Sequence, residues 1–228
     1  MDRSHSDREI SDLLVRACHD LRAAARAVRT HSELFLRDAG GPRTSDLEQR
    51  LGFVVEGTRR IEVMLDGLAA YSAALETDAA SFQSVRTDIL LRTVLMKLSR
   101  ELRDGGAEVV YTELPAVICN PDRLTQVFEN LVRNALVHRG QAAPRIHIGA
   151  SRHGEDWLFA VQDNGRGIDP ASLENIFKPF ERMQSGDRPG AGMGLAICRA
   201  IVERHGGRIW AESQAGNGAT FLFTLPAV

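Results

Sequence analysis

Apolar residues in the first third of the chain recur at alternating steps of three and four. Up to residue 37 the repeat runs through Ile10, Leu14, Ala17, Leu21, Ala24, Val28, His31 and Phe35. It resumes through Leu47, Leu51, Val54, Thr58, Ile61, Leu65, Leu68, Ser72 and Leu75. Such steps place side chains on one stripe of a helix, as in a coiled coil. We therefore predict two long helices within residues 8–77.

A break separates the two predicted helices. Residues 38–45 combine two glycines and a proline, which interrupt helices. A hairpin of two helices cannot cover both of its apolar stripes by itself, whereas two hairpins packed as a four-helix bundle can. The pattern therefore predicts a homodimer.

From about residue 80 the pattern changes to shorter segments. We expect helices at 87–103, 121–138 and 193–205, and strands at 108–111, 116–119, 145–151, 157–163, 208–213 and 219–225. Asn120 and Pro121 stand where a helix cap and a first helical residue belong. Helices combined with antiparallel hairpins predict an α+β chain that ends in a two-layer α/β sandwich. The expected domains are 1–78 and 79–228, with a linker near 76–84.

Composition narrows the possible partners. The 228 residues are 43% hydrophobic and 25% charged, as in ordinary globular proteins, and the formal net charge is −2. That charge argues against nucleic acid as the main partner, because phosphate binding needs a basic surface. The three scattered cysteines indicate a reducing compartment. No apolar run is long enough to span a bilayer, and the N-terminus lacks a signal-peptide core, so we expect a soluble, cytoplasmic protein.

The first segment with candidate chemistry lies on the predicted helix 121–138. Asn130 and Asn134 share one helix face, and His138 extends the polar row. Carboxamide oxygens are hard ligands that suit Mg²⁺. Taken alone, the row is more typical of a solvated helix face.

The second segment, Asp163-Asn164-Gly165-Arg166-Gly167-Ile168, follows a predicted strand. A carboxylate at this place can accept a hydrogen bond from the exocyclic amine of adenine. Gly165 and Gly167 would let a flat base approach the backbone. The alternative is an Asn-Gly hairpin turn.

The third segment holds Gly190, Gly192 and Gly194 before a helix, where backbone amides can bind phosphates. The alternative is a flexible loop. This glycine segment does not match a dinucleotide-binding fingerprint, because Leu195 replaces the third glycine and no strand precedes the segment. The stretch from Arg182 to Pro189 could close as a lid.

In order and spacing, these segments resemble those of the histidine kinases of bacterial two-component systems. The C-terminal part of the chain, at residues 196–198, 206–210 and 220–221, resembles phytochrome-type kinases in particular. The resemblance covers nearly the whole chain. Residues 130–134 match the N box, 163–168 the first glycine box, 176–182 the F box and 190–195 the second glycine box.

The resemblance implies a site for ATP and Mg²⁺. Its implied members are Asp163 at adenine, Asn134 at Mg²⁺, Asn130 at the phosphates, Arg182 at the γ-phosphate, Gly192 and Gly194 in the lid, and Thr220 near the base. Where the family often has a lysine, this chain has Val137, and His138 could substitute for the missing phosphate contact.

The same resemblance identifies His19 as the phosphoacceptor. At about 100° per residue, His19 points away from the apolar stripe. Asp20 would orient the imidazole ring and take its other proton. The phosphoryl group would then pass to an aspartate on the receiver domain of a response regulator. Ala24 stands where the family usually has a proline.

Two other functions stay open from the sequence. One is a phosphotransfer hub or pseudokinase that takes phosphate from a partner without ATP. The other is an ATPase like those of gyrase and the heat-shock chaperones. The signal would reach the chain from an upstream sensory domain or another subunit.

Overall fold

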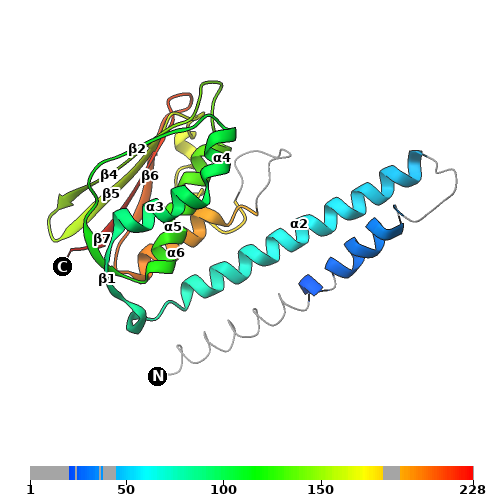
Figure 1. Cartoon of the computed structure of the whole chain (residues 1–228), viewed down its shortest axis with the longest axis horizontal. Coiled ribbons are helices and arrows are strands. Elements are labelled where there is room, and N and C mark those ends of the chain that lie inside the picture. The colour runs from blue at the N-terminus through cyan, green and yellow to red at the C-terminus, as the bar shows by residue number, and fades with distance from the viewer. Residues whose placement is uncertain (1–20, 24, 36, 38–44, 182–190, 228) are drawn as a thin grey trace. The chain divides into compact units, whose positions relative to one another are not determined.

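The computed structural model describes residues 21–23, 25–35, 37, 45–181 and 191–227 (Figure 1). The chain divides between Ala73 and Ala74 into two compact units. Within the described residues, none of the helices combines the length and the apolar character needed to cross a membrane.

The first unit contains both predicted long helices as far as the structure describes them. Residues 21–23, 25–35 and 37 are helical, and α2 spans Ser45–Leu75. Ion pairs between Arg29 and Glu62 (3.1 Å) and between Arg22 and Asp66 (2.8 Å) join the helices side by side. As the residue number rises on one helix it falls on the other, so the pair is an antiparallel hairpin.

The second unit packs helices against one face of a sheet (Figure 1). Its helices are α3 (Thr87–Lys97), α4 (Ser99–Asp104), α5 (Pro121–Val137) and α6 (Gly194–Arg204). Its strands are β1 (Gln83–Arg86), β2 (Glu108–Tyr111), β3 (Ala116–Cys119), β4 (Arg145–His153), β5 (Asp156–Asp163), β6 (Ile209–Ser213) and β7 (Ala219–Pro226). Two short 3₁₀ turns, η1 (Ala79–Ser81) and η2 (Pro170–Ser172), complete the elements.

The α+β architecture is confirmed, with three differences from the prediction. The helix predicted at 87–103 is broken at Leu98 into α3 and α4. Part of the expected linker forms β1, which pairs with β3 in a separate two-stranded sheet. The main sheet has the order β2-β4-β5-β7-β6, and β2 runs parallel to β4. The parallel pair is possible because β3 and α5 provide a crossover between these strands.

The core lies between this sheet and the helices. Phe128 of α5 packs edge-on against Phe159 and Phe223, with ring centroids 6.2 and 6.0 Å apart. Phe159 and Phe223 stack face to face at 4.8 Å. The apolar face of α5 is buried at Leu124, Val127, Phe128, Leu131, Val132 and Ala135. Because this face is fixed, the polar row on α5 is held in a defined direction.

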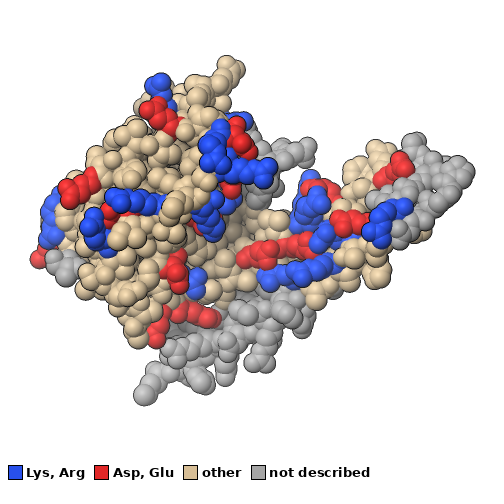
Figure 2. All heavy atoms as spheres, in the orientation of Figure 1, with Lys and Arg blue, Asp and Glu red and all other residues tan. Residues whose placement is uncertain are grey.

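Charged side chains of both signs are mixed over the face of the molecule seen in Figure 2. Opposite charges often lie close enough to pair, as at Lys97 and Glu129 (2.7 Å). Among the described residues visible on this face, Lys and Arg side chains are interspersed with Asp and Glu side chains.

Candidate nucleotide-binding site

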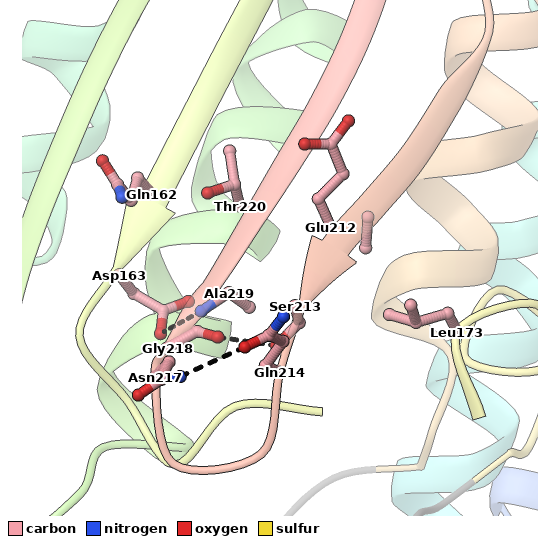
Figure 3. Close-up of a pocket in the computed structure, with 11 residues that line it drawn as sticks. Gln162, Asp163, Leu173, Glu212, Ser213, Gln214, Asn217, Gly218, Ala219 and Thr220 are labelled. Atoms are coloured by element: carbon pink, nitrogen blue, oxygen red, sulfur yellow. Dashed lines mark hydrogen bonds between the residues drawn. The ribbon is translucent and has the colours of Figure 1, made fainter. Parts of the chain in front are cut away.

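Asp163 lies at the end of β5, where the strand meets the turn between β6 and β7 (Figure 3). Its Oδ1 atom accepts hydrogen bonds from the backbone N–H groups of Gly165 (2.8 Å) and Ala219 (3.3 Å). Burial raises the pKa of Asp163, and the two N–H donors oppose that rise. Since one oxygen takes both backbone bonds, the other oxygen remains able to accept from a base amine.

The glycines of the first glycine box are required by the packing of the protein itself. A Cβ atom on Gly165 would lie 2.6 Å from the carbonyl oxygen of His138. Gly167 has φ +70°, and its Cβ would lie 2.1 Å from the carbonyl oxygen of Gln214. The segment is therefore pressed between the end of α5 and the β6–β7 turn, and it is not an Asn-Gly hairpin turn.

Helix α5 touches both glycine boxes. The Asn130 amide donates to the carbonyl oxygen of Gly194 at the start of α6 (3.1 Å). The carbonyl oxygen of His138, just after α5, accepts from the backbone N–H of Arg166 (3.1 Å). Asn134 lies between them on the helix and is half-buried. The predicted polar row of Asn130, Asn134 and His138 thus connects the two glycine boxes, which are far apart in sequence.

The described part of the second glycine box forms the start of α6. Gly192 has φ +70°, a conformation that favours glycine. Met193, at the cap position, is buried and its side chain makes no capping hydrogen bond. The first N–H groups of α6 therefore have no side-chain cap, which is the arrangement that phosphates use at helix starts.

The side chains of His138 and Arg166 meet at this junction. The Arg166 guanidinium nitrogen Nη2 lies 2.8 Å from Nδ1 of the His138 ring. A guanidinium group can only donate, so Nδ1 is the acceptor in this contact. The sequence pointed to His138 but gave Arg166 no role, because these residues are 28 positions apart and only the fold brings them together.

Thr220 is placed differently from Asp163. Both border a pocket of about 470 Å³ at the ends of β5, β6 and β7 (Figure 3). In the sheet register, however, Thr220 pairs with Gln162, whereas Asp163 pairs with Ala219. Because side chains alternate along strands, Thr220 and Asp163 occupy opposite faces of the sheet. The residue of β7 that contacts the Asp163 carboxylate is Ala219, through its backbone.

Two further residues support the site, although their sequence positions did not predict this role. The Asn164 side chain accepts from the N–H of Arg145 (2.7 Å) and donates to the carbonyl oxygen of Ala143 (2.9 Å). Ser213 accepts from the N–H of Ile168 (2.8 Å) and donates to the carbonyl oxygen of Gly218 (2.6 Å). Both side chains secure the loop after β5. A polar residue after a strand was the only signal for Asn164, and Ser213 had none.

Four predicted site residues lie outside the described residues: His19, Asp20, Arg182 and Gly190. Ala24, which replaces the proline usual in the family, and the predicted lid from Arg182 to Pro189 also lie outside the described residues.

Comparison with known proteins gives one family and several relatives. Residues 119–228 match the family described as "Histidine kinase-, DNA gyrase B-, and HSP90-like ATPase". Cyanobacterial phytochrome A of Nostoc sp. is 39% identical over 99% of this chain, which spans 29% of that relative's length. The catalytic domain of histidine kinase ThkA is 30% identical, with a TM-score of 0.56 over 64% of this chain and 95% of that one.

The fold of the whole chain also has a solved counterpart. The structure of ThkA in complex with the response regulator TrrA has a TM-score of 0.66 over 100% of this chain and 66% of that one, at 23% identity. The boxes on α5, after β5 and before α6 stand in the family order, and the match to cyanobacterial phytochrome A extends over residues of both units. The chain belongs to the sensor histidine kinases.

Proposed function

We propose that this chain is an ATP-dependent protein-histidine kinase that phosphorylates itself on His19 and passes the phosphoryl group to an aspartate of a response regulator. The observation that carries the proposal is the position of α5. One helix contacts the second glycine box through Asn130 and the first through His138. Base-binding and phosphate-binding segments thereby form one site.

In this site Asp163 anchors the adenine. Its carboxylate is held by two backbone N–H groups and accepts the exocyclic amine. A rigid acceptor loses little conformational freedom on binding, which favours affinity. Thr220, on the other face of the sheet, contributes less directly than its place in the sequence suggested.

The phosphates lie along α5 toward the start of α6. Asn130, His138, Gly192 and Gly194 line this path, with Gly190 and Arg182 completing it from the lid. Uncapped N–H groups at the start of a helix favour negative charge. The site therefore favours a nucleotide that carries a polyphosphate.

Asn134 would hold Mg²⁺ through its side-chain oxygen. Among the described residues, no hydrogen bond occupies the Asn134 side chain, so the amide is available as a ligand. Mg²⁺ prefers such oxygens together with phosphate oxygens and water, and when bound it offsets the charge of the phosphates.

The reaction is an in-line transfer. A neutral ring nitrogen of His19 attacks the γ-phosphorus, a nitrogen–phosphorus bond forms, and the bond to the bridging oxygen of ADP breaks. Asp20 orients the ring and takes its other proton, which raises the nucleophilicity of the attacking nitrogen. ADP leaves, and phosphohistidine then donates to the receiver aspartate.

The helical hairpin would carry His19 in a homodimer. Apolar side chains of its predicted stripes stay open in one copy, including Leu21 (57% exposed), Phe35 (52%) and Ile61 (47%). Two hairpins would cover them in a four-helix bundle. We assign residues 1–78 to this dimerisation domain and 79–228 to the catalytic domain.

A response regulator and a sensory input complete the proposed system. The related kinase ThkA has been solved with its response regulator, which supports a receiver domain as the partner here. Cyanobacterial phytochrome A is longer than this chain, in keeping with a sensory domain or subunit upstream. The need for ATP places the reaction in the cytoplasm.

Labelled ATP tests the proposal. Incubation with [γ-³²P]ATP and Mg²⁺ should give a protein label that is lost in acid. The label should vanish in His19→Ala and persist in His31→Ala, a matched change on the same predicted helix. Absence of label in the wild-type protein, or label that survives His19→Ala, would contradict the proposal.

Measurements of nucleotide binding and of phosphate release separate the other functions. A phosphotransfer hub would accept phosphate from a phosphorylated receiver yet bind Mg·ATP only at millimolar concentration. An ATPase would release phosphate rapidly in His19→Ala. We expect neither result.

A further inference from the structure

Arg166 has a backbone that is fixed on both sides. It lies between Gly165 and Gly167, whose close contacts leave no space for a side chain. Its N–H donates to the carbonyl oxygen of His138 (3.1 Å), and its own carbonyl oxygen accepts from the N–H of Gly216 (2.7 Å). The side chain of Arg166 therefore starts from a defined point beside the end of α5.

From this point the Arg166 side chain reaches the ring of His138. The distance between Nη2 and Nδ1 is 2.8 Å, and the guanidinium can act only as a donor. The bond thus requires Nδ1 to be unprotonated, which leaves the proton of a neutral ring on Nε2. One contact sets both the orientation of the ring and the nitrogen that donates.

Two other charged groups lie near this junction. Asp163 is engaged with Gly165 and Ala219. Arg139, one residue beyond His138, is directed toward the end of α4, with Nη1 3.5 Å from where a Gly105 Cβ would lie. Arg139 therefore offers a nearby arginine for comparison with Arg166.

We propose that Arg166 is a positioning residue for the nucleotide: it holds the His138 ring so that Nε2–H is the donor presented to the polyphosphate. This inference rests on the proposed ATP site. It gives a function to Arg166, whose side chain takes no part in the proposed contacts to the base or to Mg²⁺. Arg166 acts through His138, so its effect must depend on that ring.

Binding of a non-hydrolysable ATP analogue with Mg²⁺ to the full chain, measured by calorimetry, tests this role without catalysis. Arg166→Met removes the donor and should weaken binding about tenfold, the worth of one charge-assisted hydrogen bond. Arg166→Lys keeps a charged donor and should lose no more than about threefold. Arg139→Met should bind like the wild-type protein.

A double substitution shows whether Arg166 acts through His138. Arg166→Met should have no further effect on affinity in a His138→Ala background. In kinase assays Arg166→Met should raise KM for ATP and leave kcat nearly unchanged, and its thermal midpoint should match that of the wild-type protein. Retention of activity by Arg166→Lys would agree with the same role.

Three results would overturn the inference: wild-type affinity in Arg166→Met, losses that multiply in the double variant, or a thermal midpoint that falls together with affinity. If the wild-type chain itself fails to bind the analogue, the proposed function fails as well. If the wild-type chain binds and Arg166→Met binds equally, only the role of Arg166 is wrong.

Discussion

The two units differ in how they cover their apolar side chains. In the second unit Phe128, Phe159, Phe221 and Phe223 are each at most 1% exposed. In the helical hairpin Leu21, Val28, Phe35, Phe53 and Ile61 are 47–69% exposed. One unit therefore closes its core within a single chain, whereas the other leaves several large apolar side chains open, although Leu65 of the predicted stripe is buried.

This difference in packing suits the two parts of the proposed reaction, nucleotide binding by the second unit and phosphate acceptance by the hairpin. A nucleotide site needs fixed geometry, and a closed core supplies it because packed interiors are rigid. A phosphoacceptor helix in a dimer can derive its stability from a second copy. The comparison can be tested by adding a charge to each kind of surface.

Ile61→Glu should have the largest effect. Ile61 lies on the α2 stripe, so a dimer would bury one unpaired carboxylate from each copy, at several kcal/mol each. We expect the proposed dimer to dissociate to monomers at micromolar concentration, as measured by sedimentation or light scattering.

Met96→Glu is the matched control. Met96 is 69% exposed on α3 of the second unit, outside any predicted stripe. It should leave the mass of the assembly unchanged. A monomeric wild-type protein, or equal dissociation by both variants, would contradict the division into open and closed units.

Gly218→Ala should have the next largest effect, because it strains the closed unit beside Asp163. Gly218 has φ +76°, and its Cβ would lie 2.0 Å from the carbonyl oxygen of Asp163. Strain and overpacking together should cost about 2–5 kcal/mol of unfolding free energy. Urea titration measures this loss.

Gly154→Ala separates the two causes. Gly154 has a similar φ of +63°, but nothing lies within 4 Å of its Cβ position. It should cost about 1–2 kcal/mol from backbone strain alone. If Gly154→Ala were as destabilising as Gly218→Ala, the close contact at Asp163 would not be the cause.

Asp163→Asn should affect binding more than stability. The amide nitrogen would present a donor to the donor amine of adenine, so affinity for Mg·ATP should fall by about 1–3 kcal/mol, or roughly 10–100-fold. Because burial raises the pKa of Asp163, loss of its charge should not lower the unfolding free energy. Calorimetry and urea titration together check both parts, and a parallel loss of stability would contradict this explanation.

Periodicity predicted most elements but few of their contacts. The steps of three and four located α2, and spacing by four placed Asn130, Asn134 and His138 on one row of α5. The break at Leu98 and the parallel pairing of β2 with β4 escaped prediction, because packing between distant segments decides them. The same holds for Gly167, whose role depends on Gln214, and for Arg166, whose partner lies at the end of another element.

The smallest predicted effect concerns His205, which joins three parts of the closed unit. The ring is 5% exposed and stacks on Phe82 at 4.3 Å. Nε2 accepts from the backbone N–H of Asn120 (3.0 Å), and Nδ1 lies 2.8 Å from the carbonyl oxygen of Ile201, which can only accept. Both nitrogens are thus used by the neutral ring, and a proton on Nε2 would break the bond to Asn120.

Burial lowers the pKa of His205, opposed by the hydrogen bond to Ile201. The unfolded chain, with a pKa near 6.5, therefore takes up this proton more readily than the folded chain. The contribution of the neutral ring to the unfolding free energy is complete above about pH 6.5. It is lost as the pH falls below this value, by at most about 1.4 kcal/mol per pH unit. His205→Gln should remove this part of the slope between pH 7 and 5.5, whereas His147→Gln, at an exposed position of β4, should leave it in place. Urea titrations across that range measure both, and an unchanged slope in His205→Gln would show that the buried ring does not set the acid sensitivity of the closed unit.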